Sequence, residues 1–151
     1  MLDAVDRRLL RLWQADPDLQ VTELARELGL SQSVVSRRIE GLRERGVLRG
    51  VHGTIGWRAL GYGLEVSLRF TLEKSDPRAF DRFLAEARTI PEVVEMQTFL
   101  GRVDVRLAVV ARDLEHWKAI YAERILRLPH IADVEALMQV ARVKTDAVLP
   151  L

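Results

Sequence analysis

The stretch Val21–Leu48, VTELARELGLSQSVVSRRIEGLRERGVL, decides the N-terminal part of the fold. Its pattern is that of two short helices joined by a tight Gly-Leu-Ser turn. Thr22 is the expected N-cap of the first helix, and Gly29 can supply the left-handed residue that ends it. Ser31 is the expected cap of the second helix, which should end at Gly46. This layout predicts a helix-turn-helix.

The second of these helices has one apolar face and one polar, basic face. Val35, Ile39 and Leu42 recur at helical spacing and should be buried. The opposite face offers hydroxyls, a valine and Arg37, which suit base edges, a thymine methyl group and guanine or phosphate in a major groove. Arg38 lies nearer the buried edge, so it should meet a phosphate or an internal ion pair. The alternative is an ordinary helical hairpin with a solvated basic face.

The charge of the chain is concentrated on this helix. The formal net charge is only +1, but residues 31–50 carry five Arg against two Glu, whereas residues 1–30 carry four Arg against six acids. Affinity for nucleic acid would therefore come from local clustering. A first helix capped by Asp3, with Asp6 in capping-box position and Trp13 in the core, should complete a DNA-binding domain over residues 1–50. Residues 51–63, rich in glycine, should form a brief strand or wing and a linker.

Composition excludes several classes of protein. The 151 residues are 48% hydrophobic and 30% charged, which is typical of globular domains, and the absence of cysteine excludes disulfides and thiolate chemistry. No HExxH motif, glycine-rich phosphate loop or Ser-His-Asp set is present, and the three histidines, His52, His116 and His130, are scattered. We therefore expect no enzyme and no metal site. No apolar run could span a bilayer, so a cytoplasmic protein is expected.

Residues 64–151 should form a second domain of the α+β class. Leu64–Leu72 alternates apolar and polar residues as a half-buried strand does, and a helix should open at Ser75 or Asp76, before Pro77. Two strands, residues 93–100 and 103–110, are separated only by Gly101 and Arg102, and a helix from Asp113 and a strand over residues 134–143 follow. This order predicts a ferredoxin-like βαββαβ domain. Apolar residues in 64–72 and 134–143 should be covered by a second copy, giving a dimer that pairs two recognition helices.

Six stretches of the chain form an ordered set of motifs: LDAVDRRLLRLWQAD, LARELGLSQSVVSRRIEGLRERGVLRG, ALGYGL, FLGRVDVRLAVVARDL, LPHIADVEAL and VKTDAVLPL. In these residues and in their order, the whole chain resembles the Lrp/AsnC family of transcription regulators. The resemblance implies a sequence-specific regulator that binds double-stranded DNA, forms homodimers and higher oligomers such as octamers, and holds no cofactor. Its recognition positions correspond to Gln32, Ser33, Val34, Ser36 and Arg37, and Ser31, Arg38 and Arg49 complete the expected DNA-binding set.

The resemblance also implies that a small effector, usually an amino acid, binds at subunit interfaces. The loop Leu100, Gly101, Arg102, Val103 and Asp104 is the expected site, with Met138 and Gln139 as neighbours. Backbone N–H groups near Gly101 could hold a carboxylate, and Asp104 could receive an ammonium group unless it pairs with a neighbouring arginine. Val103 stands where the family usually has an aromatic residue, and Arg106 adds a positive charge, so the effector could be acidic or larger, or absent.

Two other functions share features with this sequence. A sequence-tolerant architectural protein that wraps DNA would use the same fold. Siroheme decarboxylase subunits also resemble the family, but a tetrapyrrole site would need histidines and arginines gathered in the second domain, and the three histidines of this chain are not gathered.

Overall fold

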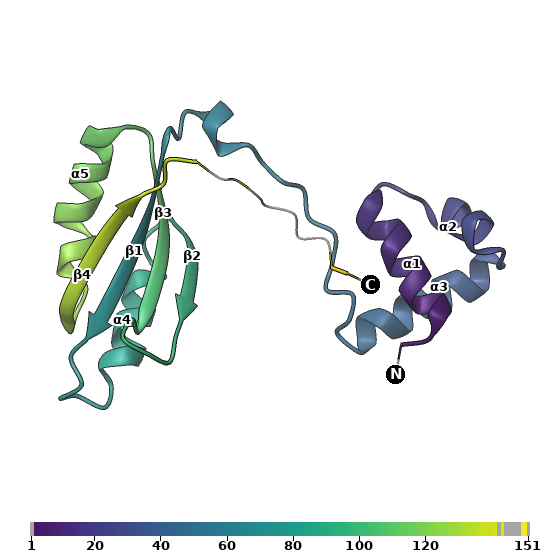
Figure 1. Cartoon of the computed structure of the whole chain (residues 1–151), viewed down its shortest axis with the longest axis horizontal. Helices are drawn as coiled ribbons and strands as arrows, with labels where there is room; N and C mark the ends of the chain where they lie inside the picture. Colours follow the sequence, from purple (N-terminus) through teal and green to yellow (C-terminus); the bar gives the residue numbers. More distant parts are fainter. Residues whose placement is uncertain (1, 142, 144–148, 151) are drawn as a thin grey trace. The chain divides into compact units, whose positions relative to one another are not determined.

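In the described residues, three N-terminal α-helices are followed by a C-terminal sheet with two α-helices (Figure 1). The computed structural model describes residues 2–141, 143 and 149–150. They divide into a helix-turn-helix unit, residues 2–54 with 149–150, and a sheet unit, residues 55–143. In the described part of the chain, no helix has both the length and the apolar character needed to cross a membrane.

The helix-turn-helix unit contains α1 (Ala4–Ala15), α2 (Val21–Leu28) and α3 (Gln32–Glu44). Asp3 caps α1 as expected, since its Oδ1 accepts the backbone N–H of Asp6 at 2.7 Å. The expected cap at Thr22 is wrong, because α2 already begins at Val21. Glu23 reaches back and accepts the backbone N–H of Gln20 at 2.9 Å, which makes Gln20 the capping position.

The core of this unit confirms the apolar pattern of the sequence. Val35, Ile39 and Leu42 of α3 are buried against Leu9 of α1 and Leu24 of α2. Gly29 ends α2 with a φ of 69°, the left-handed conformation expected of it. Ser31 caps α3 by accepting the backbone N–H of Val34 at 3.4 Å. Trp13 is half-buried beside this core, and its Nε1 donates to the carbonyl of Pro17 at 3.1 Å.

The brief strand expected after Gly46 does not form. The backbone N–H groups of Val47 and Leu48 both turn back to the carbonyl of Leu42, at 2.9 and 3.1 Å. Residues 48–56 then run without helix or strand, and a short 3₁₀ helix, η1 (Trp57–Leu60), follows. This glycine-rich segment pairs with none of the described strands, so no wing forms within the described residues.

The sheet unit has the expected ferredoxin-like order of elements. The four antiparallel strands lie in the order β2-β3-β1-β4. They are β1 (Leu64–Leu72), β2 (Val93–Thr98), β3 (Val105–Ala111) and β4 (Ile131–Met138), with helices α4 (Ala79–Ala87) and α5 (Leu114–Glu123) and the 3₁₀ helix η2 (Ile125–Arg127) between them.

Three boundaries in this unit differ from expectation. Helix α4 starts three residues later than Asp76, because the Asp76 carboxylate accepts the N–H of Arg78 at 2.8 Å and holds a turn. The β2–β3 connection is six residues long, residues 99–104, rather than two. The last strand is Ile131–Met138 rather than residues 134–143, since it is matched in register to β1 from Leu72 to Val66. Arg142, within the expected strand, lies outside the described residues.

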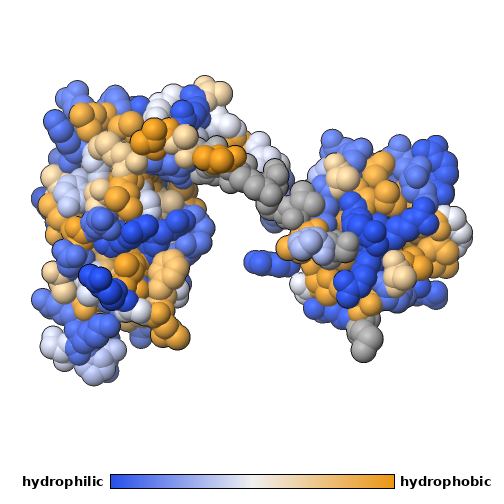
Figure 2. Space-filling model, in the orientation of Figure 1, coloured by the Kyte–Doolittle hydropathy of each residue, from blue (hydrophilic) through white to orange (hydrophobic). Residues whose placement is uncertain are grey.

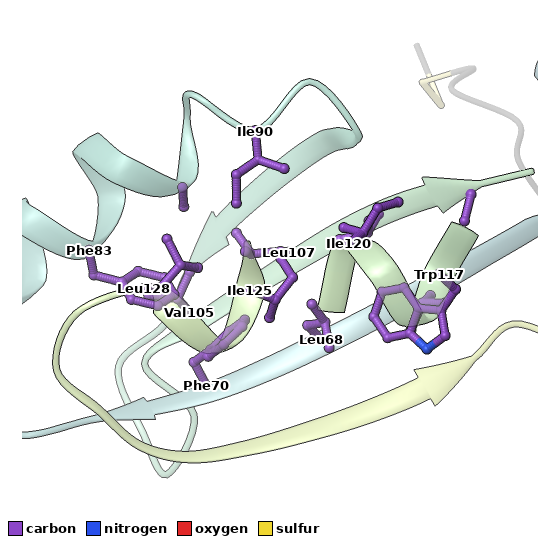
Figure 3. Close-up of a cluster of buried hydrophobic side chains, with 14 of the residues drawn as sticks. Leu68, Phe70, Phe83, Ile90, Val105, Leu107, Trp117, Ile120, Ile125 and Leu128 are labelled. Atoms are coloured by element: carbon purple, nitrogen blue, oxygen red, sulfur yellow. The ribbon is translucent and has the colours of Figure 1, made fainter. Parts of the chain in front are cut away.

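Both helices pack on one face of the sheet and enclose its core (Figure 3). Leu68 and Phe70 of β1, with Leu107 of β3, point toward Phe83 of α4 and Ile120 of α5 and are buried. The rings of Phe70 and Phe83 lie 4.9 Å apart. Alternation along β1 therefore sends its apolar side chains to the helices.

The opposite face of the sheet, which we call the open face, is polar at its centre. The apolar residues of β1 that were expected to need cover by a second copy are not on this face. Here β1 presents Glu65, Ser67, Arg69 and Thr71 instead. Arg69 pairs with Glu135 of β4 at 3.6 Å, and Arg106 of β3 pairs with Glu95 of β2 at 2.9 Å. In Figure 2 a hydrophilic band crosses the sheet unit between hydrophobic areas. Apolar residues on the open face come instead from the neighbouring strands: Ala108, Val110 and Leu137.

Candidate nucleic-acid interface and effector site

The exposed face of α3 is formed by residues that the core does not use. Because Val35, Ile39 and Leu42 point inward, the positions on the opposite side of the helix face solvent. Val34 is half-buried, and the exposed members of the expected set within α3 are Gln32, Ser33, Ser36 and Arg37; Ser31, the N-cap, is exposed as well. Arg49 is exposed as well, but it lies beyond the end of α3. Four exposed side chains therefore form one short polar and basic surface on a helix anchored from behind.

Arg38 is not part of the free surface of α3. Its Nη1 donates to Asp3 at 2.6 Å and to Asp6 at 2.8 Å. Of the two roles that the sequence left open, phosphate contact or internal ion pair, the geometry favours the ion pair. Arg45, at the end of α3, adds a contact of 3.4 Å to Asp6.

Asp6 is the buried centre of this cluster, which ties α1 to α3. It is only 4% exposed, and among the described residues it is the one charged residue that is buried. The backbone N–H of Asp6 and then Arg38 hold the pKa of the Asp3 carboxyl below its usual value. Asp3 and Asp6 in turn raise the pKa of Arg38. Sequence reasoning identified the Asp3–Asp6 capping box but missed that both acids also bind α3.

A shallow concavity of about 370 Å³ adjoins this cluster. Its walls combine the exposed side of α3 with the ion-paired residues, and they are Asp6, Val34, Arg37, Arg38, Gly41, Glu44 and Arg45. The acids within it neutralise part of the basic charge that the sequence assigned to α3. Arg37 is thus the arginine of α3 that combines exposure with a place beside the concavity.

The expected effector loop, residues 100–104, lies within the β2–β3 connection and is tied to the end of β1. The N–H of Asp104 donates to the carbonyl of Phe70 at 2.8 Å, and the hydroxyl of Thr71 donates to the carbonyl of Arg102 at 2.9 Å. Leu100 is fully exposed at the tip, and Val103 is half-buried. Gly101 has no left-handed φ, so the loop does not need glycine for a tight turn.

The Asp104 carboxylate has two partners that sequence reasoning did not identify. Its Oδ2 accepts the backbone N–H of Leu72 at 2.8 Å, and its Oδ1 accepts Nζ of Lys74 at 3.1 Å. The Leu72 N–H, followed by Lys74, lowers the pKa of this carboxyl against the raising effect of burial. The sequence suggested a neighbouring arginine as the alternative partner of Asp104. The charged partner is instead Lys74, in the segment after β1.

The two parts of the expected effector site do not lie together within one chain. Met138 pairs with Val66 and the N–H of Gln139 donates to Glu65, at the start of β1. Asp104 lies beside Phe70 and Leu72, at the end of the same strand. The five residue steps along the strand from Glu65 to Phe70 correspond to roughly 17 Å.

A helix-turn-helix unit joined to a four-stranded α+β unit defines a two-domain DNA-binding regulator. Residues 2–43 match the AsnC-type helix-turn-helix domain, and residues 65–149 match the Lrp/AsnC ligand binding domain. The chain therefore belongs to the Lrp/AsnC family of transcriptional regulators.

Individual relatives agree with this assignment. The chain is 34% identical to the proline dehydrogenase transcriptional activator of Rhodobacter capsulatus, over 87% of this chain and 86% of that protein. It is similar to a feast or famine regulatory protein from M. tuberculosis complexed with L-methionine, with 27% identity, a TM-score of 0.87 and coverage of 99% of both chains. A methionine-bound regulator from Neisseria meningitidis has the same fold, with a TM-score of 0.90, 24% identity and coverage of 99% and 97%.

Proposed function

We propose that this protein binds specific DNA sequences through α3 and adjusts that binding to the level of an amino acid. The exposed face of α3, with Arg37 beside a concavity and its apolar face anchored on α1 and α2, carries the DNA part of the proposal. Ser31, Gln32, Ser33, Val34, Ser36, Arg37 and Arg49 are the proposed contacts. Arg38 is assigned to anchoring α3 through Asp3 and Asp6.

The amino-acid part of the proposal rests on the loop of residues 99–104. Asp104 offers a carboxylate of fixed position to an ammonium group, and Arg102 is an exposed cation close to it in the chain. Backbone N–H groups around Gly101 could assist Arg102 with a carboxylate. Two relatives are described as bound to L-methionine, which makes it the first effector to test.

We further propose that two chains build each effector site. Leu100 to Asp104 would come from one copy and Met138 with Gln139 from another, because these groups lie at opposite ends of β1 within one chain. Self-association through the open face would supply a second copy. Arg106 supports this role, since its buried Nε donor has no hydrogen-bond partner among the described residues. A homodimer would also pair two α3 helices for a two-fold DNA site.

The experiment starts by recovering DNA from a random-sequence pool with the full-length protein. Affinity for the enriched DNA and for a shuffled version is then measured by fluorescence anisotropy at a fixed salt concentration, with and without each of the twenty amino acids. A specific regulator should prefer the enriched DNA by about 10³-fold or more. One amino acid should change that affinity. Equal affinity for both DNAs would favour the sequence-tolerant architectural function instead.

A further inference from the structure

The Asp104 carboxylate has a fixed position in the sheet unit. Its side chain is only 15% exposed, and one oxygen is held by the backbone N–H of Leu72 at 2.8 Å. The backbone on either side is fixed too, because Asp104 donates its N–H to Phe70 and accepts the N–H of Phe99. The other oxygen, Oδ1, is therefore held at a defined place, where Lys74 contacts it.

The cation on that oxygen is easily replaced. Lys74 places Nζ 3.1 Å from Oδ1, but its side chain is 72% exposed and follows the end of β1. A lysine ammonium is a compact, hydrated charge on a flexible stem, and ion pairs made by an exposed lysine contribute little to stability. The Asp104 carboxylate is thus fixed, whereas the Lys74 ammonium that pairs with it is held weakly.

We infer that Lys74 occupies the subsite for the ammonium group of the amino-acid effector and competes with it. This inference rests on the proposed effector site at Asp104. An effector binds Oδ1 only after the Lys74 ammonium has left, so Lys74 sets the concentration at which the protein responds. When the effector dissociates, Lys74 returns and keeps the charge of Asp104 compensated.

The charges around this subsite define the class of ligand. Arg102 is exposed in the same loop, and its carbonyl is held by the Thr71 hydroxyl at 2.9 Å. A ligand that replaces Lys74 at Asp104 leaves the guanidinium of Arg102 available for its carboxylate. The subsite therefore suits a zwitterionic α-amino acid. A carboxylic acid without an ammonium group has nothing with which to replace Lys74.

Calorimetric titration of the full-length protein can test this competition. The probes are L-methionine and 4-(methylthio)butanoate, which lacks the ammonium group. In Lys74→Met the competitor is removed, and L-methionine should bind about two- to fivefold more tightly, the range expected for an exposed ion pair. Lys74→Arg keeps a cation beside Asp104 and is the matched control, with affinity close to that of the parent. The butanoate should gain nothing from Lys74→Met.

The outcomes separate this inference from the proposed function. If L-methionine binds the parent and Lys74→Met equally well, or if the butanoate gains as much as L-methionine, competition by Lys74 is refuted. Asp104→Asn keeps an oxygen for the Leu72 N–H but loses the charge. Unchanged methionine affinity in Asp104→Asn would refute the effector site itself. Should L-methionine bind no variant, the same series is run with the other nineteen amino acids, and failure of all twenty refutes both ideas.

Discussion

Arg69 on β1 lies directly opposite Arg106 on β3, so two like charges face each other at the centre of the open face. Like charges in this arrangement destabilise a sheet by up to about 1 kcal/mol. Each arginine is compensated by an acid of the adjacent outer strand, Glu135 or Glu95. This row of charges, with a buried donor on Arg106, is the surface through which we propose that two copies of the chain associate.

Replacing Arg106 by Met should therefore weaken self-association about tenfold, because the partner would lose a hydrogen bond to a charged group worth roughly 1.5 kcal/mol. The stability of the single chain should hold, since the repulsion of Arg69 is relieved. Analytical ultracentrifugation measures the dissociation constant. Arg88→Met, at the exposed end of α4, is the control. Identical constants for the parent and Arg106→Met would contradict a role of the open face in assembly.

Arg37 and Arg38 are neighbours in sequence but should respond differently to replacement by Ala. Loss of exposed Arg37 should weaken binding to the enriched DNA by about tenfold or more without changing thermal unfolding. Loss of Arg38 should lower the unfolding temperature, because Asp6 would lose its main partner. Anisotropy and calorimetry on the same samples separate the effects. Normal DNA binding by Arg37→Ala would show that the proposed contact surface is wrong.

Replacement of Asp6 by Asn should lower the free energy of unfolding by roughly 2–3 kcal/mol, since Arg38 and Arg45 lose their buried counter-charge. Urea titration of the full chain gives the value. Asp18→Asn, in the exposed turn after α1, should stay within about 0.5 kcal/mol of the parent. If both variants behave alike, the Asp6 cluster does not stabilise the joint between α1 and α3.

The contribution of Asp104 should depend on pH. Because the Leu72 N–H and Lys74 lower its folded-state pKa, ionised Asp104 stabilises the folded state above the ordinary carboxyl pKa of about 3.9. This stabilisation should disappear as pH falls through the lowered pKa. The difference in unfolding free energy between the parent and Asp104→Asn should be constant from about pH 5 to 8 and shrink below about pH 4. Asp81→Asn, an exposed acid on α4, should show no such trend.

Two glycines of the helix-turn-helix should respond in opposite directions to Ala. Gly41 lies inside α3 with open space where a Cβ would be, so Gly41→Ala should raise stability by about 0.5–1 kcal/mol. Gly29 has a φ of 69°, and Gly29→Ala should lower stability by about 1 kcal/mol. Urea unfolding of both variants measures the contrast. Destabilisation by Gly41→Ala would mean that the α3 backbone there is not regular.

Local patterns in the sequence predicted much of this fold. The spacing of Val35, Ile39 and Leu42 identified the buried face of α3, and alternation identified β1. The predicted helix starts at Asp3, Ser31 and Asp113 were also correct, because no other nearby residue competes to cap these helices. Thr22 failed because Glu23 three residues after Gln20 offered a competing cap that positioned the helix start earlier.

Contacts between distant segments could not be predicted from such patterns. Nothing in the sequence near Asp104 points to Lys74 or to the Leu72 N–H, because the β1–β3 register brings them together. The partners of Arg38 depend likewise on how α1 packs against α3. The site residues proposed for DNA and effector remain predictions for the experiments above.

Strand β1 is made first in the sheet unit but completed last, since one of its edges pairs with β3 and the other with β4. During synthesis the edge of β1 that pairs with β4 stays unpaired while about sixty further residues are added, until β4, from Ile131 onward, has left the ribosome. A message that stops before Ile131 would therefore yield a chain with a long unpaired strand edge, open to aggregation. Complete synthesis of β4 is therefore needed to cover the second edge of β1.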